Sequence, residues 1–396
     1  MKSKRRNFMR DMVKAAVLTA PRNIEVQQFP YPEMPKNGAI IHTELSGICG
    51  TDKHTYKGEV RQYAGTPQEI TTPYPIIQGH ENVGIIEEIT KEGSLHLDFD
   101  GQILKPGDRV VMCPDTSCGD CWFCKHIPDY PWCNDVRSYG NSFSCANAPH
   151  LFGGFSQYMA ITDKVKLYKV PEGMKPELAV FAELFDVTYS LDKAKEMYAF
   201  DGEGFAFGDT VVILGAGPLG ICHMIKARML GADKVIMTDT SQFRLDIAKQ
   251  FGADLTLCLA DTTEDERVEM VYQMTGGRGA DVVVECAGEP EAFPEGLRMV
   301  RKAGTYLIVG NFVDVGRSVE LKPHELCAKN VRILGMSNHS ISGYNPSMRM
   351  MQRYQDMYPF EKLITHRMPL EDAKKAIELS MDYSQSMKIV LDPWMK

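Results

Sequence analysis

The most constraining feature of the sequence is a regular alternation of short apolar runs and helix-periodic segments between residues 209 and 309. The expected strands are residues 211–214, 235–238, 282–285 and 306–309. The expected helices between them are residues 219–230, 242–251, 265–274 and 294–300. Apolar strands that alternate with helices predict a parallel, doubly wound sheet that is covered on both faces.

A glycine-rich turn lies at the first strand-to-helix junction of this region. The G-x-G-x-x-G pattern consists of Gly215, Gly217 and Gly220, with Pro218 and Leu219 opening the helix. The first glycine permits a tight turn, the second lets the backbone approach a pyrophosphate, and the third lets helix and strand pack closely. Because free amides and the helix dipole also favour an anion here, the turn predicts a dinucleotide site.

The end of the next strand indicates which dinucleotide is bound. Asp239 follows Gly220 by 19 residues, where a carboxylate can accept hydrogen bonds from the adenosine ribose and would repel a 2′-phosphate. Arg244 can stack on adenine or hold Asp239, and it keeps NADP from being fully excluded. NAD is therefore favoured over NADP. A glycine turn that binds nothing is the alternative.

The first 180 residues follow a different pattern from residues 209–309. A chain of 396 residues is long enough for two domains. Expected strands at residues 13–18, 39–43, 83–89 and 109–112 are separated by turn residues, which predicts a β-barrel-like domain. Residues 177–197 have helical spacing. The C-terminal part holds an expected helix at 370–380 and an expected strand at 388–391.

Four cysteines form a C-x2-C-x2-C-x8-C cluster. They are Cys118, Cys121, Cys124 and Cys133. Four thiolates at this spacing can wrap one tetrahedral ion without an open position, which predicts a structural zinc site. An iron–sulfur cluster, disulfides or free thiols remain alternatives.

Two other segments carry residues of the metal-binding type. They are the stretch from Gly47 to His54, which contains Cys49, and Gly79-His80-Glu81. One thiolate and one imidazole with an open position suit a catalytic zinc site. Taken alone, however, a single cysteine is more often a buried thiol and a single histidine a satisfied core residue.

Taken in order, these motifs resemble the zinc-containing medium-chain alcohol dehydrogenase/reductase family over essentially the whole chain. The matching segments are residues 47–52, 79–81, the cysteine cluster, 153–155, the glycine turn and 285–288. The resemblance implies a GroES-like catalytic domain at 1–185, a Rossmann domain at 186–340, and a C-terminal segment at 341–396 that completes the catalytic domain. It favours the branch of sorbitol, threonine and butanediol dehydrogenases.

The resemblance also implies a set of metal ligands. Cys49, His80 and Glu183 would bind a catalytic zinc, with Glu81 as an alternate ligand. The branch usually continues glutamate–proline after its ligand, whereas this chain has Glu183-Leu184. Asp52 would orient His80 from outside the ligand set.

The same resemblance implies a proton route and a further cofactor contact. Thr51 would supply the hydroxyl at the metal, and His54 would relay the proton to water. Lys388 would approach the cofactor pyrophosphate. Zinc would act as a Lewis acid on the substrate oxygen while a hydride passes to nicotinamide.

These features predict an oxidoreductase with two zinc ions per chain that uses NAD to oxidise a secondary alcohol, such as a polyol or sugar-derived alcohol. An NADPH-linked aldehyde or ketone reductase and an L-threonine-type hydroxy-amino-acid dehydrogenase are alternatives. A nucleotide-binding protein that keeps the fold without catalysis is a third. The family suggests a homodimer or homotetramer, with an edge strand of the coenzyme domain as the expected contact.

Composition bears on partners and compartment. A net charge of −8 argues against general nucleic-acid binding, and no stretch is apolar enough for a membrane span. Clustered and isolated thiols, eleven in all, favour the reducing cytoplasm. Residues 4–10 resemble a twin-arginine export signal, which leaves a minor periplasmic alternative, and Met12 is an alternative start to Met1.

Overall fold

The computed structural model describes residues 12–91, 97–127, 130–195 and 202–396, so the twin-arginine-like residues 4–10 lie outside the described part. The chain divides into two compact units. Unit 1 comprises residues 1–183, 341–382 and 388–396, and unit 2 comprises residues 184–340 and 383–387. The expected boundaries lay after residues 185 and 340, and the five-residue return to unit 2 at 383–387 was not expected.

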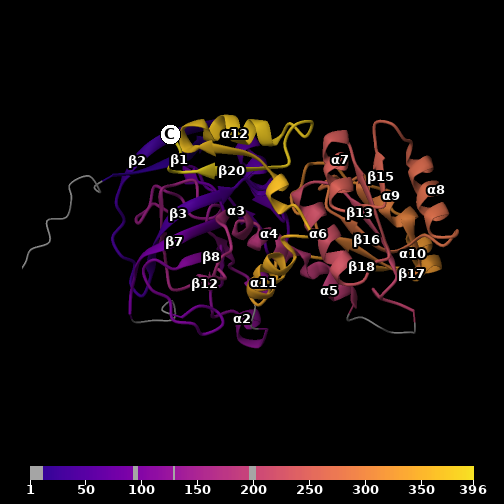
Figure 1. Ribbon diagram of the computed structural model, residues 1–396, viewed down its shortest axis with the longest axis horizontal. Coiled ribbons are helices and arrows are strands. Elements are labelled where there is room, and N and C mark those ends of the chain that lie inside the picture. The colour runs from indigo at the N-terminus through magenta and orange to yellow at the C-terminus, as the bar shows by residue number, and fades with distance from the viewer. Residues whose placement is uncertain (1–11, 92–96, 128–129, 196–201) are drawn as a thin grey trace, which may run out of the picture. The chain divides into compact units, whose positions relative to one another are not determined.

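Unit 1 is built mainly from antiparallel strands (Figure 1). Its strands are β1 (Met12–Ala20), β2 (Asn23–Pro30), β3 (Ala39–Gly47), β4 (Arg61–Gln62), β5 (Ile70–Thr71), β6 (Ile76–Ile77), β7 (Glu81–Ile89), β8 (Arg109–Cys113), β9 (Asp115–Thr116), β10 (Arg137–Ser138), β11 (Tyr158–Ile161), β12 (Lys166–Lys169), β19 (Ile364–Pro369) and β20 (Lys388–Asp392). Its helices are α1 (Gly50–Lys57), α2 (Trp122–His126), α3 (Pro176–Ala179), α11 (Tyr344–Tyr354) and α12 (Ala373–Ser380).

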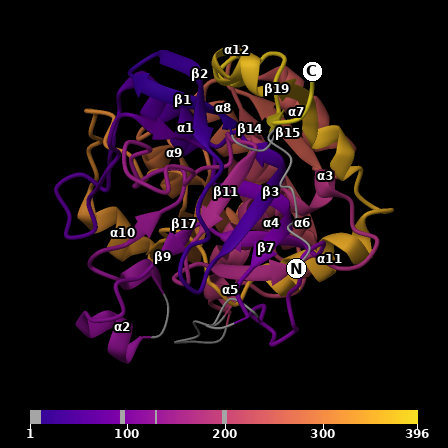
Figure 2. The same cartoon turned by 90° about the vertical axis from the view of Figure 1, so that its left-hand side faces the viewer.

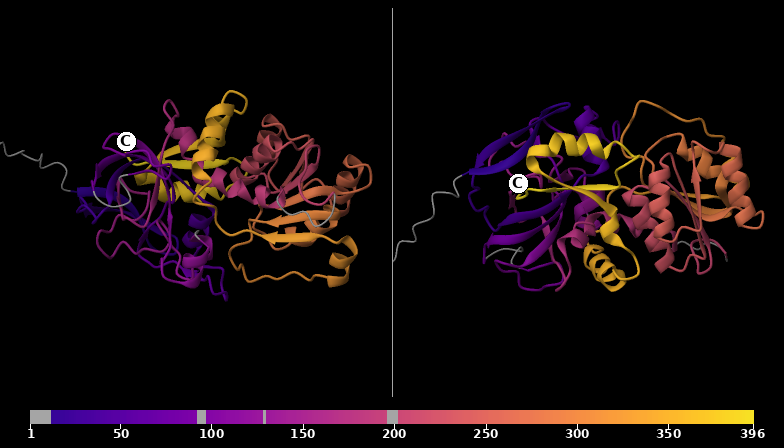
Figure 3. Two further views of the ribbon diagram at one scale, coloured as in Figure 1. Left: turned by 90° about the horizontal axis from the view of Figure 1, so that it is seen from below. Right: turned by 45° about the horizontal axis from the view of Figure 1, so that its top comes forward.

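The main sheet of unit 1 has the strand order β12-β8-β7-β3-β20-β19, with β11 also paired to β3. Figure 2 shows β3 and β7 side by side near the middle of this unit. The C-terminal helix α12 and strand β20 lie against strands from the beginning of the chain (Figure 3). Buried apolar side chains fill the unit in two clusters, one around Val17 and Ile77 and one around Ile41 and Val110.

Unit 2 is a six-stranded parallel sheet with the order β15-β14-β13-β16-β17-β18. Its strands are β13 (Thr210–Leu214), β14 (Lys234–Asp239), β15 (Leu255–Cys258), β16 (Ala280–Glu285), β17 (Val300–Ile308) and β18 (Arg332–Gly335). Its helices are α5 (Ser190–Lys195), α6 (Pro218–Met229), α7 (Gln242–Gln250), α8 (Glu264–Met274), α9 (Ala292–Met299) and α10 (Pro323–Lys329). Numbered within the unit, the order is 3-2-1-4-5-6, the arrangement of dinucleotide-binding sheets. The predicted combination of a GroES-like domain with a doubly wound sheet is confirmed.

The segment at 177–197 differs from the single helix that its periodicity predicts. Among its described residues, the structure has α3, α4 (Ala182–Asp186), a 3-10 turn at Val187–Tyr189 and α5. Val180 and Phe181 interrupt the helical run, and both side chains are buried. The chain therefore passes from unit 1 to unit 2 within a series of short helices.

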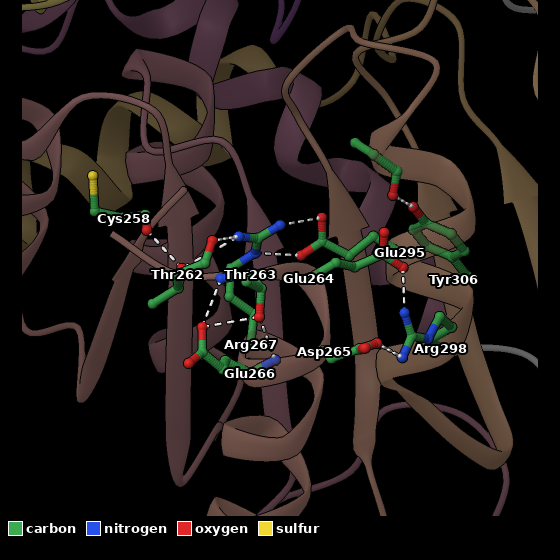
Figure 4. A network of polar contacts seen from close by, with 11 residues as sticks. Cys258, Thr262, Thr263, Glu264, Asp265, Glu266, Arg267, Glu295, Arg298 and Tyr306 are labelled. Carbon is green, nitrogen blue, oxygen red and sulfur yellow. Dashed lines mark hydrogen bonds and ion pairs between the residues drawn. The ribbon is translucent and has the colours of Figure 1, made fainter. Parts of the chain in front are cut away.

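A polar network fastens α8 to α9 on unit 2 (Figure 4). The Arg267 guanidinium binds Glu295 in a two-point ion pair, with Nε–Oε1 at 2.6 Å and Nη2–Oε2 at 3.0 Å. Both side chains are nearly buried. Thr263 caps α8 by accepting the Glu266 amide, which satisfies one of the free donors at the helix start.

Candidate active site

The four clustered cysteines form a compact set of donors in unit 1. Their sulfurs all lie within 4.8 Å of one another, with Cys118–Cys124 at 3.9 Å and Cys121–Cys124 at 3.4 Å. A Zn–S bond of about 2.3 Å in a tetrahedron requires sulfurs about 3.8 Å apart. None of the chain's eleven cysteines is in a disulfide. The sulfurs thus fit one tetrahedral zinc ion.

Backbone amides prepare these sulfurs for a cation. The Cys118 amide donates to the Cys133 sulfur at 3.2 Å, and the Cys121 amide donates to the Cys118 sulfur at 3.4 Å. Amide donation from Asn134 and Cys124 lowers the pKa of Cys121 to about 6. Hydrogen bonds that favour the thiolate therefore make Cys121 a better ligand at neutral pH, whereas burial raises the pKa of Cys124 and Cys133.

Three strand ends create a second cluster in unit 1. Because β7 runs antiparallel to β3, Gly47 at the end of β3 faces Glu81 at the start of β7. Strand β20 pairs with the same end of β3 through Val390 and Gly47, which brings Lys388 to this place. Cys49 and His80 lie just beyond the ends of β3 and β7.

The side chains of Cys49 and His80 interact electrostatically. Burial alone would lower the pKa of His80, but the Cys49 thiolate, Asp52 and Glu183 together raise it well above its usual value. His80 Nδ1 and Glu81 Oε1 are buried and have no hydrogen-bond partner among the described residues. Buried donor atoms of this kind fit a metal ligand set.

Asp52 holds the two ligand segments together through their backbones. Its carboxylate accepts the Cys49 amide at 2.9 Å and the Gly79 amide at 3.3 Å. The resemblance implied that this carboxylate orients the His80 ring. The structure instead places its hydrogen bonds on the two amides, and its influence on His80 is electrostatic.

Glu81 and Lys388 form a buried ion pair. Lys388 Nζ lies 2.5 Å from Glu81 Oε2 and 3.1 Å from the Ile48 carbonyl, and the two side chains are 3% and 1% exposed. A Cβ on Gly47 would come within 2.2 Å of the same Glu81 oxygen, so glycine makes room for this carboxylate. This arrangement differs from the expectation that Lys388 approaches a pyrophosphate, since its ammonium is committed to Glu81.

Glu183, at the start of α4, shares this environment. Its carboxylate interacts electrostatically with both His80 and Lys388. Electrostatic interactions thus link the side chains that the resemblance assigned to the catalytic metal. Among the residues that the structure describes, however, only the cysteine cluster has three or more donor atoms within 4.8 Å of one another. The second cluster also contains the Lys388 ammonium, which is paired with Glu81.

Thr51 and His54 lie on α1, directly after Cys49. Thr51 Oγ1 is 4.0 Å from the Cys49 sulfur. His54 Nδ1 is hydrogen-bonded to Glu59 Oε2, and burial lowers the pKa of His54. A neutral ring that donates from Nδ1 keeps Nε2 as an acceptor for a proton. Glu59 was not singled out from the sequence, because a lone loop glutamate carries no recognisable pattern.

Asn82 is a second residue that sequence reasoning missed. It accepts the Ser46 hydroxyl at 2.6 Å and donates to the Gly79 carbonyl at 3.1 Å, which fixes the backbone beside His80. A Cβ on Gly154 would lie 1.7 Å from the Asn82 side-chain oxygen. The Gly153-Gly154 pair was therefore the available signal that another segment packs closely here.

The glycine turn of unit 2 has the geometry that a pyrophosphate site needs. Gly215 has a φ of +103°, and a Cβ on Gly220 would meet the Gly215 carbonyl at 1.9 Å. A Cβ on Gly217 would meet only Arg244, at 3.4 Å. Helix α6 begins at Pro218, followed by Leu219, and has no side-chain cap. The open backbone and free helix start fit a dinucleotide.

Asp239 stands beside this turn. One of its carboxylate oxygens accepts the Ala216 amide at 2.7 Å, and the other accepts the Ser241 amide at 2.8 Å. Arg244 interacts electrostatically with Asp239, but its guanidinium packs on the Tyr383 ring. The expected neighbours of an adenosine ribose are thus gathered around the first turn of α7.

None of the described helices has the length and apolar character that crossing a bilayer requires.

Comparison with known proteins places the chain in a family. Residues 35–172 match the alcohol dehydrogenase GroES-like domain, and residues 218–353 match the zinc-binding dehydrogenase domain. The chain is 33% identical to 5-exo-hydroxycamphor dehydrogenase of Pseudomonas putida, covering 92% of this chain and 95% of that protein. It is 29% identical to sorbitol dehydrogenase of Bombyx mori, covering 95% of this chain and 97% of that protein.

A solved structure gives the same result. Alcohol dehydrogenase from Thermotoga maritima superposes with a TM-score of 0.84 at 32% identity, covering 96% of this chain and 99% of that chain. The chain therefore belongs to the zinc-containing alcohol dehydrogenase family and is an oxidoreductase.

Proposed function

We propose that the protein is an NAD-linked, zinc-dependent dehydrogenase that oxidises a secondary alcohol, with polyols and sugar-derived alcohols as the substrate class. The observation that carries the proposal is that His80, beside the strand ends that also hold Cys49, interacts electrostatically with both Cys49 and Glu183. A thiolate, an imidazole and a carboxylate form a three-ligand set that leaves a position open for substrate.

The charges of the proposed ligands support this choice. Ionised Cys49 and Glu183 balance the two charges of a zinc ion, and Lys388 separately balances Glu81. When bound, zinc would act as a Lewis acid on the substrate oxygen. The buried ion pair keeps Glu81 directed toward Lys388, which makes Glu183 the preferred third ligand and leaves Glu81 as the alternate.

The residues of α1 supply the proton route in this proposal. Thr51 lies next to Cys49, where its hydroxyl can accept the proton of a substrate alcohol. His54, neutral at physiological pH and oriented by Glu59, takes the proton onward. A positioned acceptor with a pKa below neutrality releases its proton readily to water.

NAD is proposed as the hydride acceptor because Asp239 places a carboxylate beside the glycine turn. Two backbone amides hold this carboxylate in place. A fixed negative charge binds ribose hydroxyls and opposes a 2′-phosphate. The cysteine cluster is proposed to hold a second, structural zinc, giving two per chain.

A cyclic, apolar secondary alcohol is a second substrate candidate, because one of the relatives above 30% identity is a hydroxycamphor dehydrogenase. L-threonine-type hydroxy amino acids are a third, because L-threonine 3-dehydrogenase of Symbiobacterium thermophilum is 29% identical. An NADPH-linked reductase, which would use the other cofactor and run the reaction in the direction of reduction, remains the alternative.

The test is a dehydrogenase screen of polyols, sugar acids, diols, β-hydroxy amino acids and bicyclic alcohols with NAD⁺ and NADP⁺, together with zinc analysis. The proposal expects NADH formation with a polyol and two zinc ions per chain. Cys49→Ser should lose one zinc and abolish turnover, with Cys145→Ser as a control, because Cys145 is a buried thiol outside both clusters. A Cys49→Ser protein with full zinc and full activity would refute the catalytic assignment.

A homodimer or homotetramer and a cytoplasmic location complete the proposal. The edge strand β18 exposes its backbone on one side, and Ile333 within it is 36% exposed, so a second copy can extend the sheet. The eleven cysteines without disulfides suit a reducing compartment.

A further inference from the structure

Five residues near the C-terminus, Tyr383–Met387, associate with unit 2 although the residues on both sides belong to unit 1. This segment, here called the strap, binds the first turn of α7. The Ser241 hydroxyl donates to the Tyr383 carbonyl at 2.5 Å, and Arg244 Nε donates to the Ser386 carbonyl at 3.2 Å. The strap therefore attaches to the turn that directly follows Asp239.

The strap fixes the side chain of Arg244. The guanidinium carbon lies 4.1 Å from the centroid of the Tyr383 ring, and Arg244 is only 7% exposed. Its Nη1 lies 3.4 Å from the position that a Cβ would take on Gly217. The aromatic ring covers one face of the guanidinium and the Ser386 carbonyl occupies Nε, so the group is held along the glycine turn.

The orientation of this arginine matters for cofactor choice. In dinucleotide-binding sheets, an arginine near the ribose carboxylate accommodates the 2′-phosphate of NADP. A guanidinium binds phosphate best when two adjacent N–H groups point at it together. Because Nε donates to the Ser386 carbonyl, the edge of the Arg244 guanidinium that pairs Nε with an Nη group is no longer open to a phosphate.

We propose that Tyr383 is a positioning residue that sets the preference for NAD over NADP by holding Arg244 along the glycine turn. Asp239 repels a 2′-phosphate, and the strap withholds the cation that would otherwise bind it. This inference rests on the proposed binding of NAD at the glycine turn and Asp239, and it adds a determinant that lies more than a hundred residues from either.

The experiment measures dissociation constants for NADH and NADPH by fluorescence titration of the intact, zinc-loaded protein. Asp239→Ser serves as the background, because it removes the opposing carboxylate. Adding Tyr383→Ala should tighten NADPH binding by about tenfold relative to Asp239→Ser alone, the effect of one new charge-assisted hydrogen bond. Tyr383 is 39% exposed, so its truncation leaves no buried cavity.

Three control variants, each made in the Asp239→Ser background, separate the effects of the Tyr383 ring, of apolar bulk and of the Arg244 guanidinium. Tyr383→Phe keeps the ring and should leave NADPH affinity unchanged. Tyr383→Leu removes the aromatic face while keeping apolar bulk, so it should reproduce the gain even if the alanine variant is unstable. Arg244→Met added to Tyr383→Ala should abolish the gain, because the guanidinium is then absent.

The inference is overturned if neither Tyr383→Ala nor Tyr383→Leu tightens NADPH binding, or if the gain survives Arg244→Met. If the wild-type protein binds NADH tightly but the variants give either of these outcomes, only the role proposed for the strap is refuted. A wild-type protein that binds NADPH more tightly than NADH, or that binds neither, would refute the proposed cofactor together with the strap.

Discussion

The buried pair of Lys388 and Glu81 gives the sharpest test of how the second cluster is built. Replacing Lys388 with methionine keeps an apolar stem of similar length but leaves the Glu81 carboxylate buried without its counter-ion. The side chains are 3% and 1% exposed, so water cannot take the place of the ammonium. Removing one partner of such a pair costs about 3–5 kcal/mol of unfolding free energy.

A double variant isolates the pair. Glu81→Gln combined with Lys388→Met removes both charges, so most of the loss should be recovered and the residual cost should fall to about 1–2 kcal/mol. The matched control is Lys14→Met, because Lys14 pairs with Glu371 at the surface, where the side chains are 48% and 51% exposed. That exposed pair should contribute less than about 1 kcal/mol.

Tryptophan fluorescence suits the assay, because the chain has three tryptophans and all of them, at 122, 132 and 394, lie in unit 1. Urea unfolding of each variant would be followed at equal, measured zinc content. If Lys388→Met is no more destabilising than Lys14→Met, the buried-pair argument is refuted. If the double variant is as unstable as Lys388→Met, packing rather than charge explains the loss.

Three further predictions concern other parts of the chain. Burial lowers the pKa of His223 to about 4 in the folded protein. When the pH falls below the ordinary histidine pKa, the unfolded state therefore binds a proton that the folded state does not, and stability decreases. Between pH 7 and pH 5 this histidine should cost about 2 kcal/mol, and His223→Gln should remove that part of the acid slope in urea titrations. Cys121→Ser should lower the zinc content by one ion per chain while NADH affinity stays unchanged; equal zinc content would contradict a structural site. Glu295→Leu should destabilise unit 2 by about 3–5 kcal/mol by stranding Arg267, and adding Arg267→Met should restore stability, as measured by thermal unfolding.

Local features of the site could be predicted from the sequence because their cause is local. The glycines at 215, 217 and 220 follow a buried strand and open a helix, and the structure has them in the turn that this order requires. The four cysteines lie within 15 residues of one another along the chain, so their convergence needs little tertiary information. The order of strands and helices in unit 2 could be predicted for the same reason.

Long-range partnerships could not be predicted in the same way. Even a nearby partner can be missed: Glu59, which orients His54, is only five residues away, but it belongs to no motif. Lys388 shows the long-range case, because Glu81 lies 307 residues earlier in the chain. The antiparallel register of β20 against β3 decides that pairing, and no single-sequence pattern specifies register between strands so far apart. The pyrophosphate contact expected of Lys388 stays a prediction, and its pairing with Glu81 is a contact that the sequence did not indicate.

The C-terminal segment has two roles, although in the sequence it looks like an ordinary loop followed by a strand. Tyr383 and Ser386 hold Arg244 beside the glycine turn, and Lys388, the second residue after Ser386, binds Glu81 in the second cluster of unit 1. A short covalent stretch thus fixes one charged group at each site. Because the chain between them is too short to absorb a large displacement, a change that loosens the strap should also affect the Glu81 pair. Measuring zinc retention in Tyr383→Ala tests this connection, and unchanged retention alongside altered NADPH affinity would show that the two ends of the segment act independently.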